Sequence, residues 1–367
     1  MTRNEIRLGL LMPDSGVLAA GFQAARAGVD ARIGAVNAAG GINGRKIVYS
    51  WRDDAGTAQG NLIGAHDLVD QQGVFGMLEF TPVASGGAAY LAEQGVPVVG
   101  LATEQVWTTN RNMFAVMNAA GTAVDTYGRA VAARGGGAAY LVRAGISAPV
   151  SGTADRVAQS LQAAGVRVVG NSPYLAGADS VTELARRIVD SGADAVVTML
   201  AAPAMPALLA AIEAAGGEPD VVLAIGAYDR GLLRPGDPSL AGMLVPVSYR
   251  PFEVGGPPTV RYLDAMHRYA PQLADPDQES PLVSYIDADL FLRGLRAAGP
   301  CPTRGAFLAA MRGLTGYDAD GLLGPTNVAL AQAHPGACFG LLRVNAAGTA
   351  FDPDETNLCG RELTPGV

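Results

Sequence analysis

Hydroxyl, acidic and small residues follow three short apolar runs of the sequence, at the points where those runs end. These positions are Thr81 after the run Val74–Leu78, Ala102 and Thr103 after Val96–Leu101, and Tyr228 and Asp229 after Asp220–Gly226. In a parallel sheet, such positions gather at the carboxyl edge, to which the N-termini of the following helices also point. Hydroxyl and N–H groups at that edge can hold an anion such as a carboxylate. Each residue alone is more typical of a helix cap or a turn, so it is their shared position that indicates a ligand-binding edge.

Catalysis would require a constellation that the sequence lacks. It contains no G-x-S-x-G nucleophile elbow, no G-x-x-x-x-G-K-[ST] phosphate loop and no G-x-G-x-x-G after a predicted strand. Its 3 histidines are dispersed and form no H-E-x-x-H motif. Asp53 and Asp54 are neighbours on an extended segment and would point in opposite directions, which favours a turn or helix-cap role over an acid–base pair. We therefore expect a protein that is not an enzyme and that holds no metal or cofactor.

The segment NAAGGINGRKI, from Asn37 to Ile47, is rich in glycine and invites comparison with a phosphate-binding loop. A phosphate loop follows a strand and precedes a helix, because the helix N-terminus supplies the N–H groups. Here the predicted order is reversed, with the helix first and the strand after. Gly40 and Gly41 are suited to ending that helix, and Asn43-Gly44 to a tight turn, so we expect no ligand at this segment.

Composition sets limits on the class of protein. The chain has 367 residues, of which 49% are hydrophobic and 16% charged, so it can fill the cores of two domains. The formal net charge is -8, the acidic residues are scattered, and no run of lysine or arginine offers an electrostatic footprint for nucleic acid. No apolar run approaches the roughly 18 residues of a membrane span.

The cysteines and the N-terminus leave the cellular compartment open. Cys301, Cys338 and Cys359 are compatible with buried thiols, with a Cys338–Cys359 disulfide in an exported protein, or with a metal site, in falling order of preference. The start, Met1–Glu5, shows no signal peptide, which fits either a cytoplasmic protein or a mature sequence behind a start methionine.

Alternating strand and helix patterns run through two thirds of the chain and occur as two series. In the first series we expect strands at Ile6–Met12, Lys46–Arg52, Val74–Leu78, Val96–Leu101 and Met113–Met117, and helices along Phe22–Val36, Gln59–Gln72, Ser85–Gln94 and Ala123–Ala133. In the second we expect strands at Ala138–Val142, Val166–Gly170, Asp194–Leu200, Asp220–Gly226 and Gly242–Tyr249, and helices at Thr153–Ala164, Val181–Ser191 and Ala204–Ala215. Two such series predict two parallel sheets flanked by helices.

The last third of the chain breaks the alternation. Its expected elements are helices at Thr259–Tyr269, Leu282–Ala298 and Thr303–Leu314 and short strands at Gly321–Gly324 and Cys338–Val344. Helices after two completed series indicate that the chain returns to the first lobe and then to the second, with crossings near 117–120, 249–251 and 321–325. We therefore expect an N-terminal lobe of residues 1–118 with 250–322 and a C-terminal lobe of 119–249 with 323–367. The fold class is α/β, with two Rossmann-like lobes.

Four segments identify a resemblance to a known family. They are IRLGLLMPDSG, NAAGGINGRKI, RDDAGTAQGN and LAEQGVPVVG, and the likeness recurs in ADAVV and PLVSYIDADLFLRGL. They resemble type I periplasmic solute-binding proteins of ABC importers, in the branch of the leucine/isoleucine/valine-binding proteins. The resemblance implies two lobes joined by three hinge strands that close on one small ligand. It also implies a monomer outside the cytoplasm, its signal sequence removed, that delivers its ligand to an ABC transporter permease.

The resemblance assigns a carboxylate grip. In amino-acid binders of this family a Ser or Thr after the third strand and an Ala-Thr pair after the fourth hold the ligand's carboxylate, and these correspond to Thr81 and to Ala102-Thr103. An aromatic residue early in the first helix corresponds to Gly21, with Phe22 beside it. A tyrosine of the second lobe falls near Pro149.

The acidic residue that pairs the ligand's ammonium in the family corresponds to Tyr228, with Asp229 adjacent. An ammonium buried without a counter-charge costs several kcal/mol. Either Asp229 takes that role or the ligand is an aromatic or aliphatic acid that has no ammonium. Phe22, Phe80, Tyr228 and Tyr285 are compatible with an apolar or aromatic ligand body and equally with core packing. The rival function is a ligand-sensing receptor or regulator core of the same fold; an α/β enzyme is the weaker rival.

Overall fold

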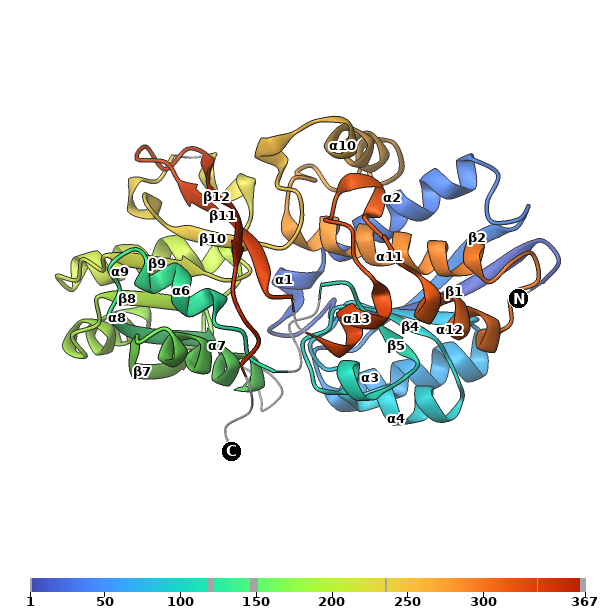
Figure 1. Ribbon diagram of the computed structural model, residues 1–367, viewed down its shortest axis with the longest axis horizontal. Helices are drawn as coiled ribbons and strands as arrows, with labels where there is room; N and C mark the ends of the chain where they lie inside the picture. Colours follow the sequence, from blue (N-terminus) through green and yellow to red (C-terminus); the bar gives the residue numbers. More distant parts are fainter. Residues whose placement is uncertain (1, 118–121, 146–150, 235, 335, 364–367) are drawn as a thin grey trace. The chain divides into compact units, whose positions relative to one another are not determined.

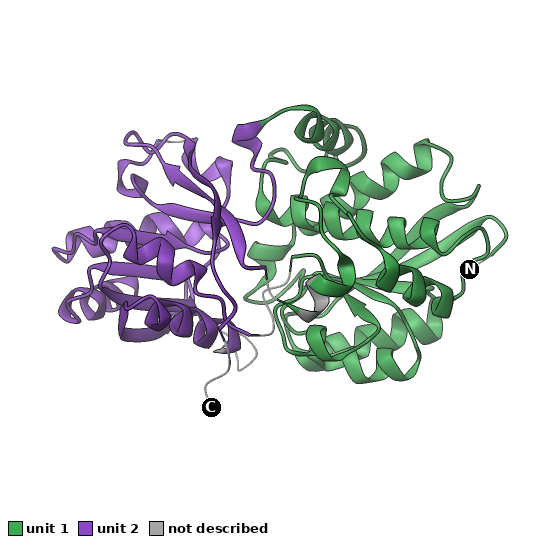
Figure 2. Ribbon diagram, in the orientation of Figure 1, with its two compact units in different colours: residues 1–121, 255–334 green, residues 122–254, 335–367 purple. Residues whose placement is uncertain are grey.

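The computed structural model divides the chain into two compact units. The structure describes residues 2–117, 122–145, 151–234, 236–334 and 336–363. Unit 1 comprises residues 1–121 and 255–334, and unit 2 comprises residues 122–254 and 335–367 (Figure 2). The chain therefore passes between the units three times.

Unit 1 contains a five-stranded sheet in which every pairing is parallel. Its strands are β1 (Glu5–Met12), β2 (Lys46–Asp53), β3 (Gly76–Glu79), β4 (Val98–Gly100) and β5 (Met113–Phe114), in the order β2-β1-β3-β4-β5 (Figure 1). The five strands expected from the apolar runs are confirmed, although β5 is shorter than its run. The doubly wound order places the carboxyl ends of β1, β3 and β4 next to one another, where ligands bind in such sheets.

The helices of unit 1 cover its sheet with apolar faces. They are α1 (Ala19–Phe22), α2 (Ala25–Ala38), α3 (Ala58–His66), η1 (Asp67–Gln71), α4 (Ser85–Glu93), α5 (Val106–Thr109), α10 (Pro257–Tyr269), α11 (Glu279–Ala297), α12 (Arg304–Gly313), η7 (Ala319–Gly321) and α13 (Val328–Ala333). Along α2 the expected inward positions Ala25, Val29, Ile33 and Val36 are buried. Helix α11 packs closely on α2, since a Cβ at Gly28 would lie 2.0 Å from the carbonyl oxygen of Pro281.

The glycine-rich segment after α2 is a helix end and a turn, as expected. Gly40 and Gly41 have φ of 96° and 76°, and the N–H of Gly41 donates to the carbonyl of Val36 at 2.9 Å. The side chain of Asn37 then fixes the start of β2, because its amide both donates to and accepts from the backbone of Ile47 at 2.8 Å. Glycine is required here because the left-handed region disfavours residues with a Cβ.

Unit 2 contains a seven-stranded mixed sheet in the order β12-β11-β10-β9-β8-β6-β7. Its strands are β6 (Ala138–Ala144), β7 (Arg167–Tyr174), β8 (Ala195–Met199), β9 (Val221–Ala224), β10 (Leu244–Val247), β11 (Cys338–Val344) and β12 (Phe351–Cys359). Strands β6 to β10 pair in parallel, whereas β11 pairs antiparallel with both β10 and β12. Its helices are α6 (Thr126–Ala132), α7 (Ser151–Ala163), α8 (Val181–Asp190), η3 (Ala202–Ala204), α9 (Met205–Ala214), η4 (Arg230–Leu233), η5 (Pro238–Leu240) and η6 (Phe252–Val254).

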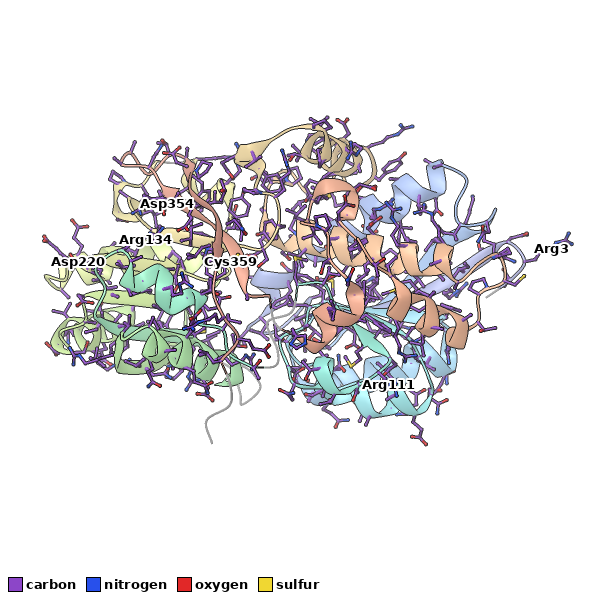
Figure 3. All side chains as sticks on the ribbon, in the orientation of Figure 1. Arg3, Arg111, Arg134, Asp220, Asp354 and Cys359 are labelled. Carbon is purple, nitrogen blue, oxygen red and sulfur yellow. A yellow bond between two sulfur atoms is a disulfide. The ribbon has the colours of Figure 1, made fainter. Side chains whose placement is uncertain are left out.

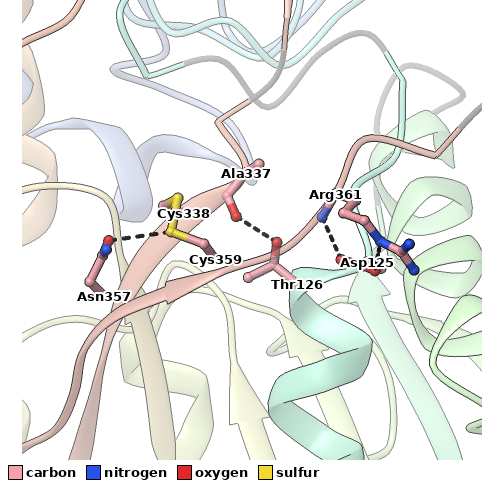
Figure 4. The surroundings of a disulfide bond; sticks show 7 residues. All are labelled: Asp125, Thr126, Ala337, Cys338, Asn357, Cys359 and Arg361. Atoms are coloured by element: carbon pink, nitrogen blue, oxygen red, sulfur yellow. Dashed lines mark hydrogen bonds and ion pairs between the residues drawn. A yellow bond between two sulfur atoms is a disulfide. The ribbon is translucent and has the colours of Figure 1, made fainter.

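A disulfide joins Cys338 and Cys359, which are directly paired residues of β11 and β12 (Figure 4). This decides among the alternatives for the cysteines, and the free Cys301 is exposed. The same end of β11 and β12 is tied to α6, because the hydroxyl of Thr126 donates to the carbonyl of Ala337 at 2.7 Å (Figure 4). The backbone N–H of Arg361 donates to Asp125 at 2.7 Å.

The passages between the units differ from the expected ranges at two places. The segment up to residue 334 lies in unit 1, because α13 contacts α12, α5 and β5. Residues 250–254 lie in unit 2, because η6 contacts β12. The expected strand Gly321–Gly324 is wrong: Gly321 ends the short helix η7, and the next three residues are turn and loop. Among the described residues, no helix has the length and apolar character needed to cross a bilayer.

Candidate ligand-binding site

The ends of β3 and β4 bring together most of the unit 1 residues proposed from the sequence. Glu79 and Gly100 are paired at the ends of these strands, and Thr81 and Ala102, both buried, follow directly. The strands approach closely because position 100 is glycine, where a Cβ would lie 1.9 Å from the carbonyl oxygen of Glu79. Thr103 is half-buried.

Two aromatic rings lie at this edge. Phe22, at the end of α1, contacts Phe80 edge to face, with ring centroids 5.6 Å apart. Phe80 is buried and Phe22 is half-buried. Edge-to-face pairs form apolar walls of defined geometry. The pair offers such a wall beside Thr81.

The Thr81 hydroxyl is engaged within unit 1. It accepts from the N–H of Val83 at 3.4 Å, and it donates to the buried carboxyl of Asp54. Asp54 also accepts from the N–H of Gly56 at 2.9 Å and from Asn61 at 3.4 Å. Burial raises the pKa of Asp54, and these hydrogen bonds oppose that rise. The turn role expected for Asp53 and Asp54 is confirmed, since Asp53 accepts from the N–H groups of Asp14 and Ala55.

The N-terminus of α4 is likewise occupied by a side chain of unit 1. Glu104 accepts from the N–H and the hydroxyl of Ser85 at 2.9 Å and 2.6 Å. Burial raises the pKa of Glu104, and the bonds from Ser85 and Ala84 lower it. A carboxylate at a helix N-terminus is stabilised by the free N–H groups there. This edge of the sheet therefore binds carboxylates already, and those carboxylates belong to the protein.

Glu79 is the feature of this edge that sequence reasoning did not assign. Its side chain is fully buried, and neither carboxyl oxygen has a hydrogen-bond partner in the described part of the chain. Burial, with smaller contributions from Asp54 and Glu104, raises the pKa of Glu79 well above its usual value. An acidic residue as the last position of an otherwise apolar strand was the signal that could have found it. Burial thus disfavours the charged form of Glu79, which makes it a poor counter-charge for a ligand cation.

A second buried acid approaches the same strands from α11. Asp287 lines a cavity of about 10 Å³ together with Phe80 and Gly100, and its Oδ2 has no hydrogen-bond partner among the described residues. Burial raises the pKa of Asp287 to about 8. Within the described residues, no group of three or more His, Cys, Asp or Glu side chains is arranged to hold a metal ion.

In unit 2, Tyr228 is a buried core residue. Its ring stacks on Phe252 at 5.7 Å and contacts Phe351 at 5.2 Å. Its hydroxyl donates to Glu253 at 2.5 Å and accepts from the N–H of Phe252 at 2.8 Å. Asp229 caps the short helix η4, where it accepts from the N–H of Gly231 at 2.8 Å. Both side chains thus have structural contacts within unit 2.

Tyr285 is not brought to the edge that holds Thr81. It lies on α11 against Tyr262, with ring centroids 5.1 Å apart, and beneath the guanidinium of Arg32 at 5.7 Å. These contacts place it in a separate cavity of unit 1. Gly21 lies in α1, half-buried beside Phe22. Pro149 lies outside the described residues.

Comparisons with known proteins bear on the whole chain. A family model described as periplasmic binding protein matches residues 5–349. A search of curated protein sequences found no match.

Solved structures resemble the chain over nearly its full length. A solute-binding protein from R. palustris in complex with 4-hydroxybenzoate has a TM-score of 0.77 at 19% identity, covering 98% of this chain and 96% of that chain. A fatty acid ABC transporter substrate-binding protein from Thermomonospora curvata gives 0.82 at 17% identity, covering 97% and 93%. A branched chain amino acid ABC transporter protein from Thermus thermophilus with bound valine gives 0.81 at 14% identity, covering 98% and 97%. At these identities the likeness establishes the shared fold.

Proposed function

The chain belongs to the periplasmic binding protein family, and from this premise we propose that it captures a small carboxylate outside the cytoplasm for an ABC importer. Capture occurs by hinge closure, since a ligand that contacts both units stabilises the closed state. The partner that receives the ligand is a permease. The Cys338–Cys359 disulfide supports an oxidising compartment, because cytosolic thiols are kept reduced.

The observation that carries this proposal is the composition of the unit 1 strand ends. The Phe22–Phe80 pair offers an apolar wall, and the hydroxyl of Thr81 and the Ala102-Thr103 segment lie beside it. The Thr81 hydroxyl can donate its hydrogen bond to a ligand carboxylate instead of to Asp54, because Asp54 keeps the hydrogen bonds from Gly56 and Asn61.

We further propose that the ligand is an aromatic or aliphatic acid without an ammonium group. Tyr228 stands where the amino-acid binders have an acid, and Asp229 caps its own helix. Burial without a hydrogen-bond partner among the described residues disfavours the charged form of Glu79, so it is a poor counter-charge for an ammonium. A buried ammonium without a counter-charge is strongly disfavoured. Relatives of the same fold bind ligands of both kinds, as the 4-hydroxybenzoate and valine complexes illustrate.

A thermal-shift panel tests the proposal. The panel holds benzoate, 4-hydroxybenzoate, octanoate, leucine and valine, with benzamide as the uncharged match to benzoate. We expect at least one acid to raise Tm while its amide and the amino acids do not. Stabilisation by the amino acids alone would contradict the ligand class, and a response to benzamide equal to that to benzoate would contradict the carboxylate grip.

A further inference from the structure

Unit 1 contains a second cavity, whose lining shares no residue with the cavity at the ends of its strands. It measures about 340 Å³ and is lined by residues of α2, α10, α11 and η7, all within unit 1. Small-molecule sites begin at about this size. The cavity has no part in the function proposed above.

On the side of α2, the cavity is lined by the nearly buried guanidinium of Arg32, which an ion pair with Asp289 holds in place. Arg32 is 9% exposed, and its Nε and Nη2 both donate to Oδ1 of Asp289, at 2.8 Å and 2.6 Å. The ring of Tyr285 lies 5.7 Å from its Cζ. The third nitrogen, Nη1, forms no hydrogen bond with any residue that the structure describes. A preorganised guanidinium with free N–H groups that lines a cavity is a donor for an anion.

Two further arginines line the cavity from one face of α10. Arg261 donates to the backbone carbonyl of Asp320 at 2.7 Å, and the guanidinium of Arg268 lies over the ring of Tyr269 at 5.3 Å. Neither forms an ion pair with a carboxylate in the described part of the chain. Residues seven apart on a helix share a face, so both side chains point to the same side of α10.

The formal charges of the cavity lining balance, but they are not evenly distributed. The lining contains three arginines, Arg32, Arg261 and Arg268, and three aspartates, Asp264, Asp289 and Asp320. Asp289 pairs with Arg32, and Asp320 pairs with Arg293 from outside the lining. With these two aspartates paired, the remaining charged residues of the lining are Arg261, Arg268 and Asp264, so α10 carries a local excess of +1 at the cavity.

We propose that this cavity is a second binding site, for a small organic anion with a flat apolar body. The anionic group, a phosphate or a carboxylate, binds Nη1 of Arg32 together with Arg261 and Arg268. The apolar body lies against Tyr285 and Leu322, which also line the cavity. Guanidinium groups bind both anions with paired hydrogen bonds, and aromatic rings favour a flat partner. The site explains why Tyr285 lies apart from the other aromatic residues considered for ligand binding.

The test is calorimetric titration of the full chain with phenyl phosphate and, separately, with benzoate. The variant is Arg261→Gln/Arg268→Gln, which leaves the buried Arg32–Asp289 pair intact and keeps good helix formers on α10. The matched control is Arg186→Gln/Arg187→Gln, which removes the same charge from two exposed arginines of α8 in unit 2. Thr81→Val reports separately on the strand ends of unit 1.

We expect the α10 variant to weaken binding of at least one probe about tenfold or more, while the α8 control stays within about twofold of the unmodified chain for both probes. Thr81→Val should stay within about twofold for phenyl phosphate, because benzoate is also a candidate ligand of the strand ends. The more affected probe identifies the anion. Equal loss in the α10 and α8 variants would mean general electrostatic attraction and would overturn the proposal. The proposal would also be overturned if neither probe bound the unmodified chain. It would be overturned as well if Thr81→Val alone, and not the α10 variant, abolished binding of both probes. The Thr81 arm keeps failure of this site distinct from failure of the proposed function.

Discussion

The strand ends of the two units carry polar groups in opposite situations. In unit 1, Glu79 at the end of β3 and Asp287, which approaches the same strands from α11, are buried carboxyls whose oxygens have unfilled hydrogen-bonding capacity among the described residues. In unit 2, the hydroxyl of Tyr228 has two partners and its ring is stacked in the core. Buried polar groups without partners cost stability and are kept where function needs them. The comparison supports the proposal above that unit 1 supplies the polar contacts to the ligand.

The largest expected effect on the free energy of unfolding comes from replacing Tyr228, the buried residue of unit 2 in this comparison. Replacing it with Ala should lower the free energy of unfolding by about 3–5 kcal/mol, because a packed ring is removed from the core. Tyr228→Phe keeps the ring and should cost about 1–3 kcal/mol through its lost hydrogen bonds. Urea unfolding measures both. If Tyr228→Phe left stability unchanged and abolished ligand binding, Tyr228 would be a ligand contact.

Next in size is the pH dependence that the buried acids give unit 1. A carboxyl with a raised pKa in the folded state contributes stability that is present below its unfolded pKa of about 4 and is lost as pH rises through the folded pKa. For Asp287 the folded pKa is about 8. Unfolding free energy should therefore fall by about 2–4 kcal/mol between about pH 5 and about pH 9.

Asp287→Asn and Glu79→Gln should each flatten that decline, since an amide cannot ionise. The readout is urea unfolding at a series of pH values, with Asp352→Asn, at an exposed position of β12, as the control. A decline as steep in both variants as in the unmodified chain would show that these acids are not its source.

A smaller, ligand-specific effect is expected at Thr81. Thr81→Val should weaken binding of the acid that most raises Tm by about tenfold to a hundredfold, because a charge-assisted hydrogen bond is lost. Thr81→Ser keeps the hydroxyl and should stay within about threefold. Calorimetric titration gives both values. Equal loss in the two variants would indicate that the methyl group, not the hydroxyl, matters.

The smallest effect is expected from the paired acid of unit 2. Asp354 bonds to Arg134 and to Nε of Arg343, the latter at 2.8 Å, and Arg134 and Asp354 are both labelled in Figure 3. Although burial opposes it, this pairing lowers the pKa of Asp354, so its contribution to stability is present above the unfolded pKa and is lost as pH falls. Asp354→Asn should cost about 0.2–1 kcal/mol at neutral pH and nothing in acid, measured by urea unfolding. A loss that persisted in acid would point to packing instead.

Hydrophobic pattern predicted much of this fold, because strands buried in a parallel sheet read as apolar runs. The pattern failed for a strand whose residues are mostly exposed and for an apolar run that does not pair with any described strand. Strand β12 was missed because it is an edge strand with mostly exposed residues, held by pairing with β11 and by the disulfide. The run Gly321–Gly324 was taken for a strand because its two leucines are apolar, but neither pairs with a neighbouring strand.

The site was partly predictable for a related reason. The positions of Thr81, Ala102 and Thr103 after predicted strands grouped them at one sheet edge, and the structure pairs those strand ends. Position after a strand could not tell that the hydroxyl of Thr81 would bond to Asp54, since the two residues lie far apart in sequence. Nor could it separate Tyr285 from Ser284 and Asp287, because one step along a helix turns a side chain by about 100° toward another cavity.

The central claim, capture of an acid that lacks an ammonium, is tested most directly with matched pairs. Calorimetric titration would compare 3-phenylpropanoate with phenylalanine, and 4-methylpentanoate with leucine, since each pair differs only in the ammonium group. We predict that the acid binds at least about tenfold more tightly than the amino acid in the pair whose side chain fits. Tighter binding of the amino acid in either pair would contradict this account.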